Sequence, residues 1–410
     1  MSAAAASVHG GLYSLEWAAP EFIVIEFDRL RTERSADITA DVAVRRTAPG
    51  LEGHIHSARL LMTGTRARGD LAKHLADRTK GAGIDWPHLV EEAVVAALDH
   101  YRAGEPPILL RDAVPPDGAT WLLPPLVLAV QPTIWFGDGG VGKSALALAA
   151  GLSIHMDRGD LLGVAPTAKR VVAYLDWEFD ACEHRERMRQ LVGGQMPDIV
   201  YRRCQVPLRD DVERLNRFIR DWGIDFLIID SVAAACGDEP ESAAVALAFF
   251  NALRQLGCGA LCIAHTTKNG SEERPFGSTF WHNGARCTWL VKKERDTSAT
   301  GFIAGMFNKK SNSGPLASSI GFEFDFGGDR LAISRTDIRE VVGFEPHIPL
   351  RERMRAALRS GAASVRDLAT VLGEPEGSVR KAVDRDNGRT FIRLEGDGEP
   401  LRVGLLDRGR

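Results

Sequence analysis

Residues 137–144 read Gly137-Asp138-Gly139-Gly140-Val141-Gly142-Lys143-Ser144. This spacing is typical of a phosphate-binding loop, in which glycines let backbone N–H groups turn toward a phosphate. In such a loop Lys143 reaches the β- and γ-phosphates, and the Ser144 hydroxyl ligates Mg²⁺. A β-prone run, Pro132–Phe136, precedes the loop, and a helical pattern follows it through about Ile154. The sequence therefore predicts that residues 137–144, with Ala145, bind ATP and Mg²⁺ at a helix N-terminus.

The composition is that of a globular protein. The chain has 410 residues, of which 44% are hydrophobic and 26% charged, and its length predicts two or three domains. No run of about 18 apolar residues occurs, so we expect no membrane span and a cytoplasmic location. The small residues Met1–Ser7 lack a basic n-region, which favours a disordered tail over a signal peptide. The net charge of −4 argues against a polyanion-binding surface over the whole protein.

The six cysteines all lie in the middle of the chain, and none forms a C-x-x-C pair. Several of them lie in apolar runs. This pattern predicts reduced, buried thiols, as in a cytosolic protein.

Three domains are expected. Residues 1–115 are predicted to form an α+β domain of unknown role, because β-prone runs are followed by two helical patterns. The expected strands are Phe22–Phe27, Ile38–Val44 and His54–Met62, and the expected helices are 66–77 and 86–102.

Residues 116–340 alternate apolar strands with helices, which is typical of an α/β fold with a mainly parallel sheet. The expected strands are Thr133–Phe136, Arg170–Leu175, Asp225–Ile229, Ala260–Ala264, Cys287–Lys292 and Gly301–Phe307, followed by a hairpin of Ile320–Phe326 with Arg330–Ser334.

Residues 350–410 are predicted to form a third domain. Its pattern is three helices followed by a β-hairpin. The expected helices are 351–359, 365–372 and 375–386, and the expected hairpin strands are 388–394 and 401–406.

Three strand ends in the middle domain carry polar residues suited to nucleotide hydrolysis. Asp230 ends an apolar strand and is placed to complete the Mg²⁺ shell with Ser144. Glu178 follows the strand after the loop and is the preferred base for the attacking water, with Asp176 and Asp180 as alternatives. His265 ends the strand that follows the Asp230 strand along the chain, where it can sense the γ-phosphate.

Further cations are candidates for DNA or phosphate contacts. The polar segment 267–277 carries Lys268 and Arg274, which we expect to contact nucleic acid. Lys310 lies in a turn predicted to follow a strand. A neighbouring subunit would supply Lys310 or Arg286 to the γ-phosphate.

Together these residues resemble the RecA-like ATPases, particularly the hexameric replicative helicases of the RepA and DnaB type. The resemblance covers about 118–340 and includes Gly277-Ser278-Thr279 and the late turn Lys310–Gly314. It implies that Glu178 is the catalytic base, His265 the γ-phosphate sensor and Lys310 a finger acting in trans. DnaB-type rings carry K-x-R in the late turn, whereas this chain has Lys310-Ser311-Asn312, so Arg286 is the alternative finger.

The last sixty residues resemble a winged helix-turn-helix. Arg380, Lys381 and Arg385 lie on the expected recognition helix, and such a helix fits the major groove of DNA. Residues 351–410 carry 13 Lys and Arg against 10 Asp and Glu. Further arginines lie on the expected wing: Arg389, Arg393 and Arg402.

The sequence therefore predicts an Mg-ATP-dependent motor that forms a ring or filament, most simply a hexamer, and acts on DNA. Single-stranded DNA would occupy the ring channel and duplex DNA the winged helix. A helicase or translocase of a phage, plasmid or mobile element fits best, with replication or mobile-element proteins as partners. The alternatives are an ATPase that loads, remodels or regulates proteins, and a nucleotide-switched DNA-binding regulator.

Overall fold

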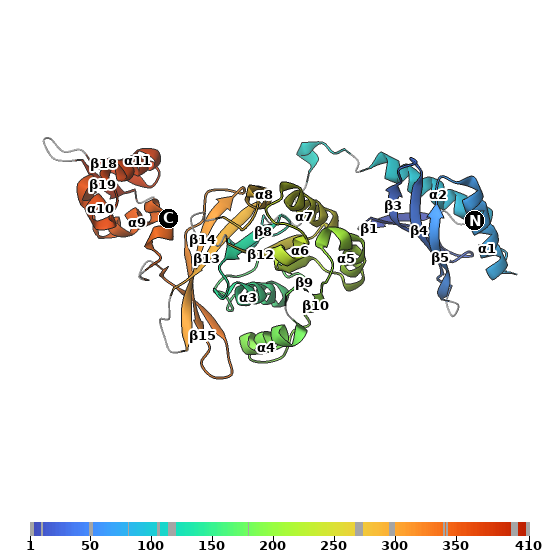
Figure 1. Cartoon of the computed structure of the whole chain (residues 1–410), viewed down its shortest axis with the longest axis horizontal. Coiled ribbons are helices and arrows are strands. Elements are labelled where there is room, and N and C mark those ends of the chain that lie inside the picture. The colour runs from blue at the N-terminus through green and yellow to red at the C-terminus, as the bar shows by residue number, and fades with distance from the viewer. Residues whose placement is uncertain are drawn as a thin grey trace. The chain divides into compact units, whose positions relative to one another are not determined.

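The computed structural model describes most of the chain (Figure 1). Its contacts divide the chain into two compact units. The first unit comprises Met1–Ala119, Val206–Asp225 and Ala248–Cys258, and the second comprises Thr120–Gln205, Phe226–Leu247 and Gly259–Arg410. The described residues are 4–9, 11–48, 52–80, 82–104, 107–113, 120–178, 180–266, 274–294, 300–338, 341, 343–394 and 401–406.

The first unit contains a five-stranded antiparallel sheet in the order β1-β2-β3-β4-β5. Its strands are β1 (Ala5–His9), β2 (Leu12–Trp17), β3 (Ile23–Thr32), β4 (Ile38–Arg46) and β5 (Gly53–Leu61). Helices α1 (Thr65–Arg78) and α2 (Trp86–Ala103) follow, and their apolar faces share one core with alternate residues of the strands. Helix α5 (Leu208–Trp222) belongs to this unit, where Arg217 pairs with Asp28 at 2.7 Å.

The expectation of a disordered tail is wrong for the described residues of β1. Ala5 to His9 pair with β2 in an antiparallel ladder that runs from Ala5 opposite Glu16 to His9 opposite Leu12. The strand is held by backbone hydrogen bonds at the edge of the sheet, and the side chains of residues 5–8 are exposed. A strand without a buried face has no alternating hydrophobic pattern, so the sequence does not signal it.

The second unit is built on a nine-stranded sheet in the order β10-β9-β11-β12-β8-β13-β14-β15-β16. The strands from β10 to β13 in this order are parallel, and β14, β15 and β16 add antiparallel strands at one side. The mainly parallel α/β sheet predicted from the sequence is confirmed. The strands are β8 (Thr133–Gly137), β9 (Val172–Asp176), β10 (Val200–Arg203), β11 (Phe226–Asp230), β12 (Gly259–His265), β13 (Cys287–Lys293), β14 (Gly301–Ser311), β15 (Ile320–Asp325) and β16 (Ala332–Thr336).

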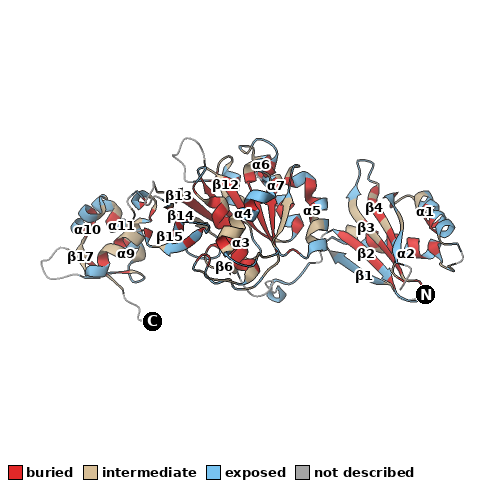
Figure 2. Cartoon of the chain, turned by 90° about the horizontal axis from the view of Figure 1, so that it is seen from below, coloured by how far each residue is buried: buried red, intermediate tan, exposed pale blue. Residues whose placement is uncertain are grey.

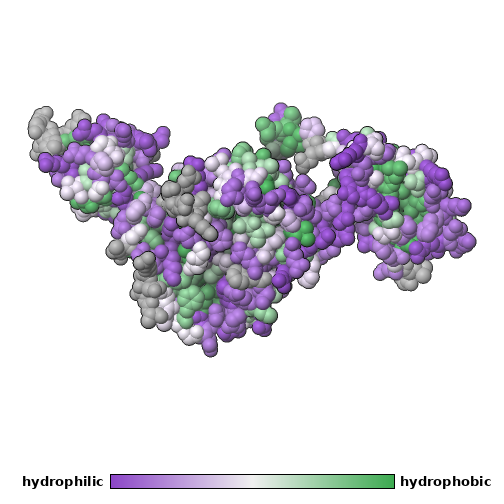
Figure 3. Space-filling view, viewed as in Figure 1, coloured by the Kyte–Doolittle hydropathy of each residue, from purple (hydrophilic) through white to green (hydrophobic). Residues whose placement is uncertain are grey.

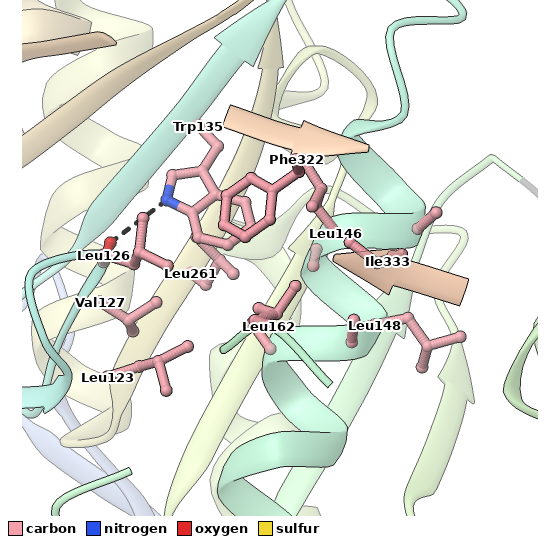
Figure 4. Close-up of a cluster of buried hydrophobic side chains, with 14 of the residues drawn as sticks. Leu123, Leu126, Val127, Trp135, Leu146, Leu148, Leu162, Leu261, Phe322 and Ile333 are labelled. Carbon is pink, nitrogen blue, oxygen red and sulfur yellow. Dashed lines mark hydrogen bonds between the residues drawn. The ribbon is translucent and has the colours of Figure 1, made fainter. Parts of the chain in front are cut away.

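Helix α3 (Lys143–Met156) crosses β8, β9, β11 and β12 and is buried on almost every side, as its nearly all-apolar sequence requires. In Figure 4 its residues Leu146 and Leu148 lie in one cluster with Phe322 and Ile333. The indole N–H of Trp135 in the same cluster donates to the carbonyl oxygen of Leu126 over 3.2 Å. Figure 2 shows the buried residues gathered along the strands of this sheet. The core therefore fixes α3, and with it the glycine loop at its N-terminus.

Other helices complete this part of the chain. They are α4 (Ala181–Val192), α6 (Val232–Cys236), α7 (Ala243–Leu256), which the unit boundary crosses, and α8 (Thr279–Gly284). The short strands β6 (Trp121–Leu123) and β7 (Val127–Leu128) form a separate two-stranded ladder.

The C-terminal segment contains the three helices and two hairpin strands expected from its pattern. They are α9 (Leu350–Ala357), α10 (Val365–Leu372), α11 (Glu376–Asp386), β18 (Phe391–Leu394) and β19 (Arg402–Leu405), and β17 (Ala363–Ser364) joins the hairpin in a three-stranded sheet. Met354, Val379 and Phe391 are among the residues of a small core of its own. The Ser364 hydroxyl accepts from the N–H of Asp367 over 3.0 Å and caps α10.

In the described part of the chain, no helix has the length and apolar character needed to cross a membrane. All six cysteines are free thiols, and Cys204, Cys236, Cys262 and Cys287 are buried. Cys258 is half-buried. The expectation of buried thiols is wrong for Cys182, which is exposed because it lies on the outer face of the first turn of α4.

Candidate nucleotide-binding site

A cavity of about 700 Å³ opens in the second unit where the loop after β8 meets the ends of β9, β11 and β12. The carboxyl ends of parallel strands are where open α/β sheets bind their ligands. The loop residues that line the cavity are Gly139, Gly140, Gly142, Lys143, Ser144 and Ala145. The predicted nucleotide loop therefore faces this cavity.

The glycines of the loop meet two distinct requirements. Gly140 and Gly142 have φ values of 72° and 88°, in the left-handed region that favours glycine. A Cβ on Gly137 would lie 2.2 Å from the carbonyl oxygen of Val291 in β13. The turn and the close approach of β13 thus exclude side chains at these positions.

Lys143 is 5% exposed, and its ammonium donates to the carbonyl oxygens of Gly137 and Asp138 over 2.9 and 2.7 Å. Burial lowers the pKa of Lys143, and the carboxylates of Asp230, Asp138 and Glu178 oppose this shift. The two carbonyls hold the ammonium at the loop, where a bound phosphate would meet it.

Asp138 ties the loop to the neighbouring strands. Its carboxylate accepts from the hydroxyl of Thr266, just after β12, and lies 3.7 Å from the ammonium of Lys292 in β13. The Thr266 hydrogen bond is the main reason that the pKa of Asp138 is lowered. The second loop residue is therefore anchored on two sides.

Asp230 is 1% exposed at the end of β11 and lines the cavity. Burial raises its pKa, whereas hydrogen bonds from the hydroxyls of Ser144 and Tyr174 lower it. The Tyr174 hydroxyl lies 2.6 Å from Oδ2 of Asp230. A carboxylate and a hydroxyl in contact supply the hard oxygen donors that Mg²⁺ prefers. Ser144 and Asp230 therefore fit the magnesium site predicted for them.

Glu178 lines the same cavity and is held by two polar partners. Its carboxylate accepts from the hydroxyl of Ser231, and its Oε1 lies 3.7 Å from Nε2 of His265. The His265 imidazole is the largest influence holding the pKa of Glu178 below its usual value. The structure thus brings the predicted base and the predicted sensor together.

The two alternative bases have other contacts. Asp176 is fully buried beside Asp230 in the sheet, and its oxygens accept from the N–H of Glu178 and the Tyr201 hydroxyl and contact Nε2 of His184. Asp180 caps α4 by accepting from the N–H of Cys182 over 2.8 Å. Neither lines the cavity, so Glu178 is the best placed of the three carboxylates.

Sequence reasoning did not identify Arg187, a cation of α4 that lines the cavity. One of its terminal nitrogens donates to Glu183 over 2.7 Å. Its other terminal nitrogen, NH1, is buried and makes no hydrogen bond with any residue that the structure describes. One feature of the sequence could have pointed to Arg187. It follows Glu183 by one helical turn, on the helix that comes directly after Glu178.

The predicted trans cations lie outside the cavity lining. The turn expected at Lys310 is wrong, because β14 continues to Ser311 and pairs Lys310 with Thr288. The Lys310 ammonium donates to the carbonyl oxygens at the end of α8, those of His282, Asn283 and Ala285, over 2.7 to 2.9 Å. Arg286 is exposed beside this helix end.

The residues predicted to contact DNA are mostly exposed. Arg274 is exposed, whereas Lys268 lies outside the described residues. Arg380, Lys381 and Arg385 are exposed on α11, and Arg389 follows in the next turn. Two of the three arginines on the expected wing have partners, since Arg393 pairs with Asp384 and Arg402 donates to the carbonyl oxygen of Ala362 over 2.6 Å.

Two of the comparisons with known proteins found a similarity. Residues 106–271 match the family model described as an AAA domain. A KaiC-like protein from the hyperthermophilic archaeon Pyrococcus horikoshii OT3 is a similar solved structure, at 12% identity and a TM-score of 0.38, with 53% of this chain and 94% of that chain covered. No curated protein matched the sequence. The matched segment contains the glycine loop, Glu178, Asp230 and His265.

Proposed function

We propose that the protein is an Mg-ATP-dependent motor that assembles from identical subunits, in the simplest case a hexamer, and moves on DNA as a helicase or translocase. The observation that carries the hydrolytic part is the contact of Glu178 with His265 in the cavity of the glycine loop. Glycine loop, buried carboxylate and water-activating base are the parts that nucleotide hydrolysis requires.

The residues of the cavity have different roles in hydrolysis. Loop N–H groups and Lys143 bind the phosphates, while Ser144 and Asp230 hold Mg²⁺, which supplies charge neutralisation at the β- and γ-phosphates. Glu178 accepts a proton from the attacking water. His265 contacts Glu178, so its position can report the state of the γ-phosphate to the segment after β12.

Arg187 extends this assignment. Arg187 lines the cavity, and its NH1 nitrogen has no hydrogen-bond partner among the described residues. Phosphate oxygens are suitable acceptors for a guanidinium. We assign it a phosphate contact within the same subunit. Lys310 or Arg286 would then act across a subunit interface.

The proposed DNA contact rests on the C-terminal segment. Its helices α10 and α11 are joined by a short turn, and a small β-hairpin follows, which is the element order of a winged helix-turn-helix. Exposed Arg380, Lys381 and Arg385 on α11 would contact phosphates or base edges.

One observation favours the alternative of an ATPase that remodels proteins. Arg393 and Arg402, on the expected wing, already have partners within the segment, which leaves the wing with fewer cations for phosphates. A winged helix of this kind can dock proteins instead of DNA.

The test is ATP turnover with and without single-stranded DNA, together with displacement of a labelled strand from a forked duplex. The proposal predicts stimulated turnover and ATP-dependent displacement, both lost in Lys143→Ala. ATP turnover that is unchanged by single-stranded DNA, with no displacement of the labelled strand, would favour an ATPase that remodels proteins. Tight binding to one defined duplex without displacement would favour a regulator.

A further inference from the structure

Three phenylalanine rings form a stack beside the glycine loop. Phe302 in β14 and Phe324 in β15 have centroids 4.4 Å apart and planes 16° apart. Phe326, just after β15, lies 6.3 Å from Phe324 at an interplanar angle of 18°. These spacings are those of favourable aromatic pairs, so the three rings form one continuous surface.

This stack belongs to the nucleotide cavity. All three rings line it, together with Leu331. A Cβ placed on Gly142 would lie 2.9 Å from the Phe324 ring and 3.1 Å from the Phe302 ring, which puts the stack directly against the loop. The cavity therefore has a polar end, at Lys143 and Asp230, and an aromatic end.

The outermost ring is unusual for a packed phenylalanine. Phe324 and Phe302 are 1% and 8% exposed, but Phe326 is 47% exposed while it is stacked on them. In Figure 3 an apolar area lies where Figure 1 draws β14 and β15. A ring needed only for the core would be covered, whereas this one leaves an open aromatic face at the cavity.

We propose that Phe326, supported by Phe324 and Phe302, is the subsite for the base of a purine nucleoside triphosphate. This inference deepens the proposed function and rests on it, because the phosphates must occupy the glycine loop. Stacking on an aromatic ring tolerates any base, since every base has a π-face. The three rings supply no hydrogen-bonding group, so they select by stacking area and favour purines over pyrimidines.

The two ends of the cavity then bind different parts of the nucleotide. The loop end recognises the triphosphate, and the ring end recognises the base. A ligand with phosphates but no base, inorganic tripolyphosphate, should therefore depend on Lys143 and not on Phe326. ATP should depend on both.

The experiment measures the Kd of ATP and of tripolyphosphate, each with Mg²⁺, for the full-length protein and three variants. Phe326→Ala should raise the Kd of ATP about tenfold or more, as expected for a lost base stack, and leave tripolyphosphate binding unchanged. Phe326→Tyr should bind ATP like the native protein. Phe280→Ala, which removes an exposed phenylalanine of α8 outside the cavity lining, is the matched control and should change neither Kd.

Two outcomes would overturn the base subsite. One is an unchanged Kd of ATP in Phe326→Ala. The other is an equal weakening of ATP and tripolyphosphate, which would show that the ring supports the loop and does not bind the base. If Phe326→Ala unfolds, Phe326→Leu keeps the apolar contact, removes the ring and must show the same selective loss. Lys143→Ala tests the proposed function separately, because it must lose both ligands.

Discussion

The hydroxyl of Tyr174 donates a hydrogen bond of 2.6 Å to Oδ2 of Asp230, and both side chains are at most 1% exposed. Burial beside Asp230 raises the pKa of Tyr174 well above its usual value, so the hydroxyl remains a donor at neutral pH. The bond joins two adjacent strands, β9 and β11, and fixes one carboxylate oxygen. The other carboxylate oxygen of Asp230 is then free to contact Ser144 and to face the cavity.

We therefore predict that Tyr174→Phe raises the Mg²⁺ concentration needed for half-maximal ATP turnover. The lost hydrogen bond lowers the pKa of Asp230 in the native protein, so its removal raises that pKa further. The charged carboxylate of Asp230 then forms only at higher pH, so the acid limb of the pH–rate profile should move to higher pH. A Mg²⁺ titration at several pH values measures both effects, and an unchanged titration and profile would show that Tyr174 serves packing alone.

Lys143→Ala should abolish ATP turnover and weaken ATP binding, because it removes the only ammonium that lines the described cavity. Glu323→Gln is a suitable control, since Glu323 is exposed on β15 and does not line the cavity. Equilibrium binding of a fluorescent ATP analogue measures the loss of ATP affinity. Native affinity in Lys143→Ala would be incompatible with the loop as the phosphate site.

Much of this site was predictable because it is local in sequence. The glycine loop is contiguous, and Glu178, Asp230 and His265 each end or follow an apolar run at the edge of a parallel sheet. Asp176 shows the limit of such reasoning. It also ends a strand, but its contacts with Tyr201 and His184 only appear once α4 and β10 are placed.

The residues that sequence reasoning missed depend on long-range packing. Phe302 and Phe324 read as ordinary alternating strand residues, and only the antiparallel pairing of β14 with β15 stacks them against Gly142. The sequence predicts a turn at Lys310, just past a strand. The strand extends through it because pairing with β13 continues to Ser311.

Lys310 holds the end of α8 in its own subunit, in addition to the contact across a subunit interface that is proposed for it. Its ammonium satisfies three carbonyls at the end of α8, so Lys310→Ala should lower the melting temperature, whereas the exposed Arg286→Ala should not. If either cation acts across an interface, mixing its alanine variant with Glu178→Gln should restore some turnover, because certain interfaces would carry both intact groups. No recovery for either variant, under proven subunit exchange, would exclude a trans finger at these positions.

The C-terminal segment makes a separate prediction about DNA. Replacing Arg380, Lys381 and Arg385 together by alanine should weaken duplex binding and leave basal turnover intact. Each lost phosphate contact should reduce the log–log salt slope by roughly 0.9. Arg366→Ala, at an exposed position of α10, is the control. Equal affinity and slope in the triple variant would indicate that the segment docks protein.

Glu178→Gln tests the proposed hydrolysis most sharply when its ATP turnover and its ATP affinity are measured on the same preparation. Glu178 is the cavity carboxylate held by Ser231 and His265, and glutamine keeps its size but cannot take the proton of the attacking water. We predict ATP binding like that of the native protein and turnover reduced by about 10²-fold or more. Turnover near the native rate would contradict it.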